Sequence, residues 1–269
     1  MKIAINGLGR IGRAFLKLVV ERPEIEVVAI NDLGDLDNLA YLLKYDSVYG
    51  RYHRQVSMEP GFLVIENKKI KFLQEKDPTK LPWKDLGVDI VVESTGVFET
   101  FEKAQAHITA GAKRVVITAP SKDDDLSLKL CTTSLCGLNE ESFAKVKITS
   151  NGSCTTNAVA PVMAILSETL GIKKALLNTT HAYTASQKIV DGPDTKDWRR
   201  GRAGAINLVP STTGAAITVG KVIQSLNGIF DGISVRTPVP IVSLADITFV
   251  SSRPTSVEEV NKIMKDAAA

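Results

Sequence analysis

The sequence predicts an α/β protein that begins with a parallel sheet covered by helices on both faces. Apolar runs of strand length alternate with helical runs through the first half of the chain. A glycine-rich turn joins the first strand to the first helix. Near-continuous apolar strands that alternate with helices are typical of parallel sheets buried on both sides.

Composition excludes several classes of protein. The 269 residues suffice for two domains, and 44% apolar with 23% charged residues is typical of a globular protein. The net charge of +3 is too small to indicate a specific nucleic-acid partner. No apolar run approaches the ~18–20 residues of a membrane span. Three unevenly spaced cysteines suit a reducing compartment, so we expect a cytoplasmic protein.

The first strand and helix carry a dinucleotide-binding pattern. A strand over 2–6 precedes Gly7-Leu8-Gly9-Arg10-Ile11-Gly12, and a helical run over 13–21 follows. Gly7 would permit the tight turn, Gly9 would let a pyrophosphate approach the backbone, and Gly12 would let the helix pack on the strand. The pyrophosphate would lie at the helix N-terminus.

An acidic residue follows the second strand, which we expect over 26–31. Asp32 lies about 20 residues beyond the last glycine of the pattern, where a carboxylate accepts hydrogen bonds from the adenosine ribose. The same charge would repel a 2′-phosphate. The sequence therefore predicts NAD rather than NADP as the cofactor.

Further strands are expected over 69–73, 88–93 and 114–118, with helices to about residue 45 and over 100–110. Ligands of parallel sheets bind beyond the carboxyl ends of the strands. The segments Ser94-Thr95-Gly96 and Thr118-Ala119-Pro120 fall at such ends.

Residues 121–142 offer little recognisable chemistry. Asp123-Asp124-Asp125 is most simply a solvated surface loop. We interpret Cys131 and Cys136 as small apolar filler, because a metal site needs more ligands than this segment offers. We expect no metal site in the protein.

A candidate nucleophile, Cys154, lies in the stretch 150–157, Ser-Asn-Gly-Ser-Cys-Thr-Thr-Asn, between a strand-like run and an Ala/Leu-rich helical run. Unpaired N–H groups and the helix dipole at such a place favour the thiolate. A buried structural cysteine between capping hydroxyls is the alternative. His181, delivered by a strand over 175–180, favours the activated thiol. Pro161 should kink the helix or shift its start.

Basic residues in the second half suggest anion binding. The polar stretch 186–204 carries several arginines, which would bind a phosphate or a subunit or simply be solvated. Arg236 lies among apolar residues of an expected strand, so it needs an anionic partner, either a structural carboxylate or a substrate phosphate. Another long strand over 242–250 and a helix from 257 complete the chain.

The stretch around Cys154 and the segment His181-Ala-Tyr-Thr-Ala-Ser-Gln resemble the active-site segments of phosphorylating glyceraldehyde-3-phosphate dehydrogenases. The likeness runs from Met1 to near the C-terminus, except over 121–142. It implies an NAD-binding Rossmann domain over 1–150 and a catalytic α+β domain over 151–269, the latter built on a mixed, largely antiparallel sheet.

The resemblance also implies an activity. Cys154 would attack the aldehyde of glyceraldehyde 3-phosphate with His181 as base, NAD would accept a hydride, and inorganic phosphate would release 1,3-bisphosphoglycerate from a thioester. Such enzymes are typically cytoplasmic homotetramers of glycolysis. An erythrose-4-phosphate dehydrogenase shares the Cys/His pair and stays an alternative, as does a non-catalytic NAD-binding or redox-sensing fragment.

Other residues match the family's binding positions. Cofactor contacts are implied for Arg10, Ile11, Asp32, Lys76 and Thr118, besides the glycines Gly7, Gly9 and Gly12. The substrate phosphate would meet Thr184 and Arg236, with Arg200 close by. The attacking phosphate would meet Ser153, Thr155, Thr213 and Gly214.

The chain departs from the family pattern at a few positions. Gly152 stands where alanine is usual, Ala158 where a second cysteine is usual, and Val239 and Ile241 alter a Pro-Thr-Pro-Asn segment. The resemblance also stops inside the catalytic domain, before the family's usual end. We therefore expect a C-terminally truncated chain whose dehydrogenase activity is severely reduced or absent, and in which Cys154 can still be modified.

Overall fold

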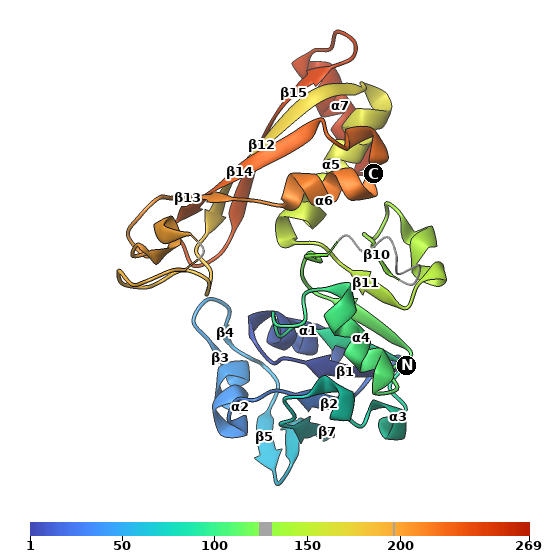
Figure 1. The fold of residues 1–269 in the computed structure, drawn as a ribbon, viewed down its shortest axis with the longest axis vertical. Helices are drawn as coiled ribbons and strands as arrows, with labels where there is room; N and C mark the ends of the chain where they lie inside the picture. The colour runs from blue at the N-terminus through green and yellow to red at the C-terminus, as the bar shows by residue number, and fades with distance from the viewer. Residues whose placement is uncertain (124–130, 196) are drawn as a thin grey trace. The chain divides into compact units, whose positions relative to one another are not determined.

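A computed structural model describes residues 1–123, 131–195 and 197–269 (Figure 1). They form two compact units, each with its own sheet. The first unit comprises Met1–Ser134 and Glu140–Asn151, and the second comprises Leu135–Asn139 and Gly152–Ala269.

The first unit is built on a sheet that is parallel over most of its width. Within the described residues the strand order is β10-β11-β9-β8-β1-β2-β7-β6-β5. The parallel strands are β1 (Lys2–Asn6), β2 (Glu26–Asn31), β7 (Lys68–Leu73), β8 (Ile90–Glu93), β9 (Arg114–Ile117), β10 (Cys131–Thr133) and β11 (Ile148–Ser150). The strands β5 (Val56–Glu59) and β6 (Phe62–Ile65) add an antiparallel edge.

Helices accompany this sheet as the alternating pattern predicts. They are α1 (Arg10–Val19), α2 (Leu36–Lys44), α3 (Trp83–Leu86) and α4 (Phe101–Thr109), with 3₁₀ turns at η1 (Pro78–Lys80) and η2 (Glu140–Lys145) and a small hairpin of β3 (Tyr45–Asp46) and β4 (Gly50–Arg51). Helix α1 begins one turn earlier than expected, because Gly9 serves as its N-cap. Two clusters of buried apolar side chains fill the unit.

The order of the strands reverses beside β1. The chain passes from β1 to β2 and β7 on one side and then from β8 to β9 and β11 on the other. The carboxyl ends of the central strands are in register: Asn6 of β1 is paired with Asn31 of β2 and with Glu93 of β8. A crevice for ligands forms at such a reversal.

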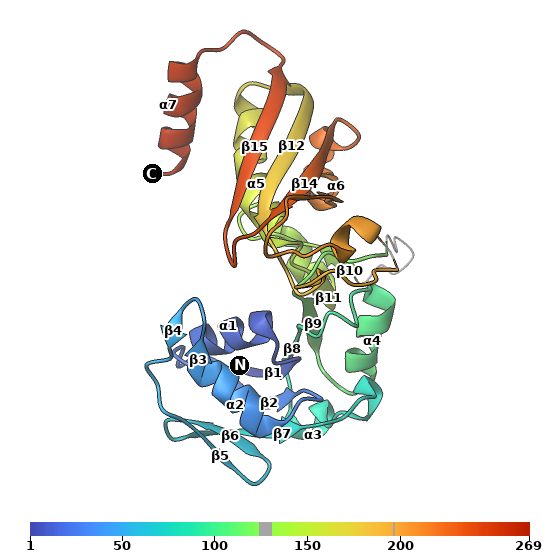
Figure 2. The ribbon, with the colours of Figure 1, turned by 90° about the vertical axis from the view of Figure 1, so that its left-hand side faces the viewer.

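The second unit has a mixed, largely antiparallel sheet in the order β13-β14-β12-β15, as far as the structure describes it. Figure 2 shows β15, β12 and β14 side by side. Its strands are β12 (Ile172–Ala182), β13 (Val209–Thr212), β14 (Phe230–Thr237) and β15 (Ser243–Ser251). The β12–β14 pair is parallel, whereas β12–β15 and β13–β14 are antiparallel. Both predicted sheet types are therefore confirmed.

Two helices supply the core of this unit. They are α5 (Cys154–Thr169) and α6 (Ala215–Val222), whose apolar faces pack with β12 and β14 in one buried cluster. Pro161 lies inside α5 without shifting its start from Cys154. The 3₁₀ turns η3 (Trp198–Gly201) and η4 (Gln224–Leu226) and helix α7 (Val257–Ala267), which lies beside α5, complete the unit.

The structure corrects two expectations for residues 121–142. Asp123 is not simply solvated: its carboxylate accepts hydrogen bonds from the backbone N–H groups of Phe101 and Glu102 at the start of α4. Asp124 and Asp125 lie outside the described residues. Cys131 packs against the apolar core as predicted, but Cys136 is exposed and is not filler.

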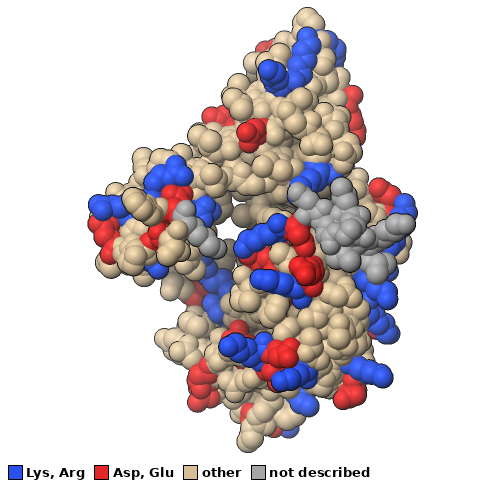
Figure 3. Space-filling model, viewed as in Figure 1, with Lys and Arg blue, Asp and Glu red and all other residues tan. Residues whose placement is uncertain are grey.

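Charged side chains of both signs are interspersed over the face shown in Figure 3. Among the helices of the described residues, none has the length and apolarity that a bilayer crossing requires. The described residues also contain no group of three or more His, Cys, Asp or Glu side chains arranged to hold a metal ion.

Candidate active site and dinucleotide pocket

Cys154 is the first residue of α5. Gly152, with a φ of +64°, turns the chain into the helix, and the Ser153 hydroxyl caps it by accepting from the Thr156 N–H at 3.0 Å. Cys154 is an exposed residue at the end of the helix where backbone N–H groups point outward, although its thiol group is partly buried. The predicted position at a helix N-terminus is therefore what the structure describes.

His181 faces this thiol from β12. Its Nε2 lies 3.5 Å from Cys154 Sγ, which is within hydrogen-bonding distance for sulfur. The other ring nitrogen, Nδ1, lies 2.7 Å from the carbonyl oxygen of Ala182. The sequence could not show that these two side chains meet, but the packing of α5 against β12 brings them together.

Cys154 and His181 shift each other's pKa in opposite directions. The hydrogen bond from His181 lowers the pKa of the Cys154 thiol, and contacts with Thr155 add to that effect, while partial burial opposes it. The hydrogen bond to Cys154 raises the pKa of His181, although burial and the charge of Arg236 act against it. Both shifts favour a thiolate beside an imidazolium.

Arg236 completes this cluster from β14. It is the register partner of His181 on the neighbouring strand, and its Nη1 lies 2.9 Å from His181 Nδ1 and 3.2 Å from the Ala182 carbonyl oxygen. Of the two partners that the sequence left open, a structural carboxylate is not found: within the described residues no Asp or Glu is ion-paired with Arg236. Burial lowers the pKa of its guanidinium, and nearby Arg200 lowers it further.

The arginines of the polar stretch 186–204 mostly pair with carboxylates of the same stretch. Arg199 pairs with Asp197 at 2.9 Å, and Arg202 pairs with Asp191 at 3.1 Å. Arg200 lies farther from Asp197, at 3.9 Å, and its Nε and Nη2 donate to the Ser211 hydroxyl at 3.0 and 2.6 Å. The Arg200 side chain is thereby 26% exposed, and its charge acts on Arg236.

The other predicted phosphate-binding residues have local contacts. The Thr184 hydroxyl lies 2.9 Å from that of Ser186, and Thr155 is buried in the first turn of α5. Thr213 accepts from the Ala215 N–H at 3.2 Å, beside Gly214, the N-cap of α6. A Cβ added at Gly214 would meet no atom within 4 Å, so the space beside it is open. Helix ends of this kind suit phosphate groups.

A separate pocket of about 430 Å³ opens at the carboxyl ends of the central strands in the first unit. Four predicted cofactor residues line it, namely Gly7, Gly9, Asp32 and Lys76. Ser94 and Thr95, which the sequence placed at a strand end where ligands bind, also line it. Further lining residues were not singled out from the sequence: Asn6, Asn31, Leu33, Glu75, Pro78, Val97 and Phe98. The polar residues Asn6 and Asn31 that end two apolar strands were the signal in the sequence that could have identified part of this set.

The three glycines have distinct surroundings that fit a bound dinucleotide. Gly7 has a φ of +96°, and a Cβ there would lie 2.7 Å from the backbone of Thr95. A Cβ at Gly12 would lie 2.1 Å from the Gly7 carbonyl oxygen, so this glycine lets helix and strand approach. Nothing lies within 4 Å of a Cβ at Gly9, and α1 has no side-chain cap there. The exposed N–H groups of this helix end can therefore meet a phosphate.

Asp32 is held rigidly at the rim of this pocket. Its two carboxylate oxygens accept from the Leu8 N–H at 2.6 Å and from the Gly34 N–H at 2.7 Å. Each oxygen keeps a further lone pair for a ribose hydroxyl.

The remaining predicted cofactor residues do not line the pocket. Arg10, Ile11 and Gly12 lie in the first turn of α1, and Ile11 is exposed. Thr118 donates from its hydroxyl to the Glu93 carbonyl oxygen at 3.0 Å.

Comparison with known proteins agrees with this geometry. Residues 1–101 match the family described as "Glyceraldehyde 3-phosphate dehydrogenase, NAD binding domain", and residues 153–269 match its C-terminal domain. Over the whole chain, the sequence is 47% identical to a glyceraldehyde-3-phosphate dehydrogenase of Shimwellia blattae and 48% identical to one of Haemophilus influenzae. These alignments span 79% and 77% of the two relatives. A relative of the same name from Eremothecium gossypii is 47% identical, with 79% of its length spanned.

Both domains of this family match the chain in order, and the relatives align over the whole of this chain. The chain therefore belongs to the glyceraldehyde-3-phosphate dehydrogenase family.

Proposed function

We propose that this protein oxidises glyceraldehyde 3-phosphate to 1,3-bisphosphoglycerate with NAD and inorganic phosphate. The observation that carries the proposal is Cys154 at the start of α5 with its sulfur 3.5 Å from His181 Nε2. A thiolate at a helix N-terminus beside an imidazolium is suited to attack an aldehyde.

The proposed reaction depends on where the proton shared by Cys154 and His181 moves. The Cys154 thiolate bonds to the aldehyde carbon, and the His181 imidazolium gives its proton to the carbonyl oxygen to form a hemithioacetal. Neutral His181 then takes that proton back as the hydride leaves, which yields a thioester. Phosphate oxygen attacks the thioester carbon, and the thiolate departs again. His181 therefore acts as acid and then as base in one turnover.

Two groups of residues would hold the two phosphates. For the substrate phosphate we propose Thr184, Arg236 and Arg200, since Arg236 is half-buried and lacks a carboxylate partner among the described residues. For the attacking phosphate we propose Ser153, Thr155, Thr213 and Gly214, which lie at the N-terminal ends of α5 and α6.

The cofactor residues would be the glycine turn, the first turn of α1 and Asp32. We assign Gly7, Gly9 and Gly12 to the turn, Arg10 and Ile11 to the pyrophosphate, and Asp32 to the adenosine ribose, with Lys76 and Thr118 as further contacts. NAD, when bound, supplies the hydride acceptor. In this assignment residues 1–150 bind the cofactor and 151–269 carry out the chemistry.

The test is NADH formation from the aldehyde, measured with and without phosphate. We expect turnover that requires phosphate and is lost in Cys154→Ser, whereas Cys131→Ser keeps it. Oxidation of erythrose 4-phosphate without any need for phosphate would replace the proposal with an erythrose-4-phosphate dehydrogenase. Binding of NAD and thiol labelling without any turnover would indicate a non-catalytic NAD-binding or redox-sensing protein.

We further propose a cytoplasmic homotetramer. In the loop around η3, Trp198 is 85% exposed, Ile189 81% and Ile206 80%, which supports burial of this surface against another copy. Light scattering at micromolar concentration should give a mass above that of one chain, and a monomer would contradict the proposal.

A further inference from the structure

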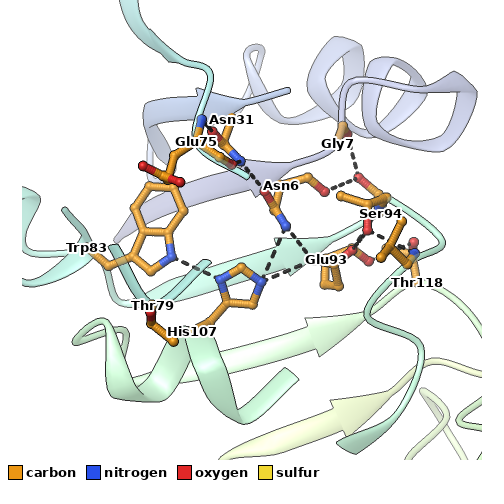
Figure 4. Close-up of polar contacts among 12 residues, drawn as sticks. Asn6, Gly7, Asn31, Glu75, Thr79, Trp83, Glu93, Ser94, His107 and Thr118 are labelled. Carbon is orange, nitrogen blue, oxygen red and sulfur yellow. Dashed lines mark hydrogen bonds and ion pairs between the residues drawn. The ribbon is translucent and has the colours of Figure 1, made fainter. Parts of the chain in front are cut away.

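Three polar side chains end neighbouring strands of the first unit and form a buried row. Asn31, Asn6 and Glu93 are register partners across β2, β1 and β8, and they are 5%, 1% and 2% exposed (Figure 4). Buried polar groups of this kind must find hydrogen-bond partners. Here the partners fix the direction of each hydrogen bond.

The donor-to-acceptor direction of these hydrogen bonds is fixed first by the loop after β7. The Glu75 backbone N–H can only donate, and it lies 2.8 Å from Asn31 Oδ1, so the amide orientation of Asn31 is determined. Asn31 Nδ2 then donates to Asn6 Oδ1 at 2.7 Å. Asn6 therefore presents Nδ2 to Glu93 Oε2, at 2.6 Å.

The direction is set independently from α3. The indole N–H of Trp83 can only donate, and it lies 3.0 Å from His107 Nδ1. That nitrogen must therefore be the acceptor, so His107 is neutral and carries its proton on Nε2. This proton is donated to Glu93 Oε2 at 3.0 Å. The 3.4 Å approach of Asn6 Nδ2 to His107 Nε2 is then between two donors that share one oxygen.

The other carboxylate oxygen of Glu93 is also saturated by donors. Thr95 donates to Oε1 from its backbone N–H at 2.8 Å and from its hydroxyl. Three of these four groups, the Asn6 amide nitrogen, the His107 N–H and the Thr95 N–H, can only donate, and this arrangement favours an ionised Glu93 carboxylate. In the described part of the chain no Lys or Arg is ion-paired with it, and neutral His107 does not cancel its charge.

This charge lies directly behind the wall of the dinucleotide pocket. Asn6, Asn31, Glu75 and Thr95, which belong to the network around Glu93, all line that pocket. Asp32, Glu75 and Lys76 are the ionisable groups on its lining. A buried carboxylate acts through a medium of low dielectric, so salt screens its field much less than that of a surface charge.

We propose that Glu93 is a positioning residue of the NAD site with an electrostatic role. Its carboxylate fixes the pocket wall at Asn6 and Thr95, and its uncancelled charge favours the oxidised cofactor, whose nicotinamide ring carries one more positive charge than that of NADH. The inference rests on the proposed NAD-linked function. Its test measures binding alone, so it is independent of whether the protein turns over substrate.

The experiment compares the dissociation constants of NAD and NADH by calorimetry on the full chain. In Glu93→Gln the preference for NAD over NADH should fall by about fivefold. Glu93→Asp keeps the charge but withdraws it from Thr95, so both affinities should weaken while their ratio is retained. Asp89→Asn is the matched control, because Asp89 is a half-buried carboxylate just before the same strand, already paired with Lys113 at 2.7 Å. It should leave the ratio unchanged.

An unchanged ratio in Glu93→Gln would overturn the electrostatic role. If that variant does not fold, ¹⁵N NMR of the wild-type histidines decides the matter. We expect one protonated and one unprotonated ring nitrogen for His107, assigned by its loss in His107→Gln. Protons on both nitrogens would mean that the Glu93 charge is cancelled, which would equally refute the proposal.

Discussion

The Arg236 guanidinium lies against the imidazole of His181, with Nη1 2.9 Å from Nδ1. Both groups also approach the Ala182 carbonyl oxygen, at 3.2 and 2.7 Å. The hydrogen bond to Cys154 raises the pKa of His181, and the Ala182 carbonyl adds to it, but the arginine charge opposes the shift. An anion that neutralised Arg236 would remove this opposition.

Removal of the arginine charge should therefore make His181 more basic. In Arg236→Gln we expect the pKa of His181 to rise above its wild-type value, because one unfavourable cation has been removed. Titration of the imidazole by NMR measures this directly. Arg202→Gln serves as the control, since Arg202 is exposed and pairs with Asp191. A rise in both variants would point to a general charge effect rather than to the contact with His181.

The Cys154 thiol should react with iodoacetamide at a pH where an ordinary thiol is protonated. Its pKa is lowered chiefly by His181, so the thiolate persists as the pH falls until that lowered pKa is reached, and reactivity is lost only below it. In His181→Asn the loss should move to higher pH. A Cys131→Ser, Cys136→Ser background restricts labelling to Cys154. Identical profiles with and without His181 would contradict the pairing.

Gly152→Ala should destabilise the second unit more than a matched substitution elsewhere in the same unit. Gly152 has a φ of +64°, and an added Cβ would lie 3.1 Å from Thr156 Cγ2. Gly228, with a φ of +75°, has no atom within 4 Å of its Cβ, so it isolates the backbone cost of roughly 1 kcal/mol. We expect a lower free energy of unfolding for Gly152→Ala than for Gly228→Ala in urea titrations. Equal values would show that Thr156 moves aside without cost.

Asp32→Gly should relax the choice between NAD and NADP. The carboxylate lines the pocket and would repel a 2′-phosphate, so we expect clear preference for NAD in the wild type and much weaker preference in the variant. Calorimetric titration with both cofactors measures it. The variant also loses the acceptor of the Leu8 and Gly34 N–H groups, and a thermal melt should accompany the titration. Equal wild-type affinities would show that Asp32 does not face the ribose.

Much of this molecule is determined by local sequence. The alternation of apolar strands with helices predicts the parallel sheet, because strand and helix periods are properties of short stretches. The glycine pattern predicts the turn between β1 and α1, since only glycine tolerates a φ of +96° at position 7 without strain. Cys154 at a helix start is equally local, because a capping serine precedes it.

Which distant side chains contact one another was decided only by the tertiary structure. Nothing near Arg236 in the sequence indicates whether a carboxylate or an imidazole lies beside it, and the pairing of β12 with β14 settles this. Asp123 caps a helix that begins 22 residues earlier, so no local pattern identifies its role. Likewise, the direction of the hydrogen bonds around Glu93 depends on Trp83, His107 and Asn31, which belong to three other elements. Periodicity and backbone preference act over a few residues, whereas hydrogen-bond direction and charge depend on what the fold brings within about 3 Å.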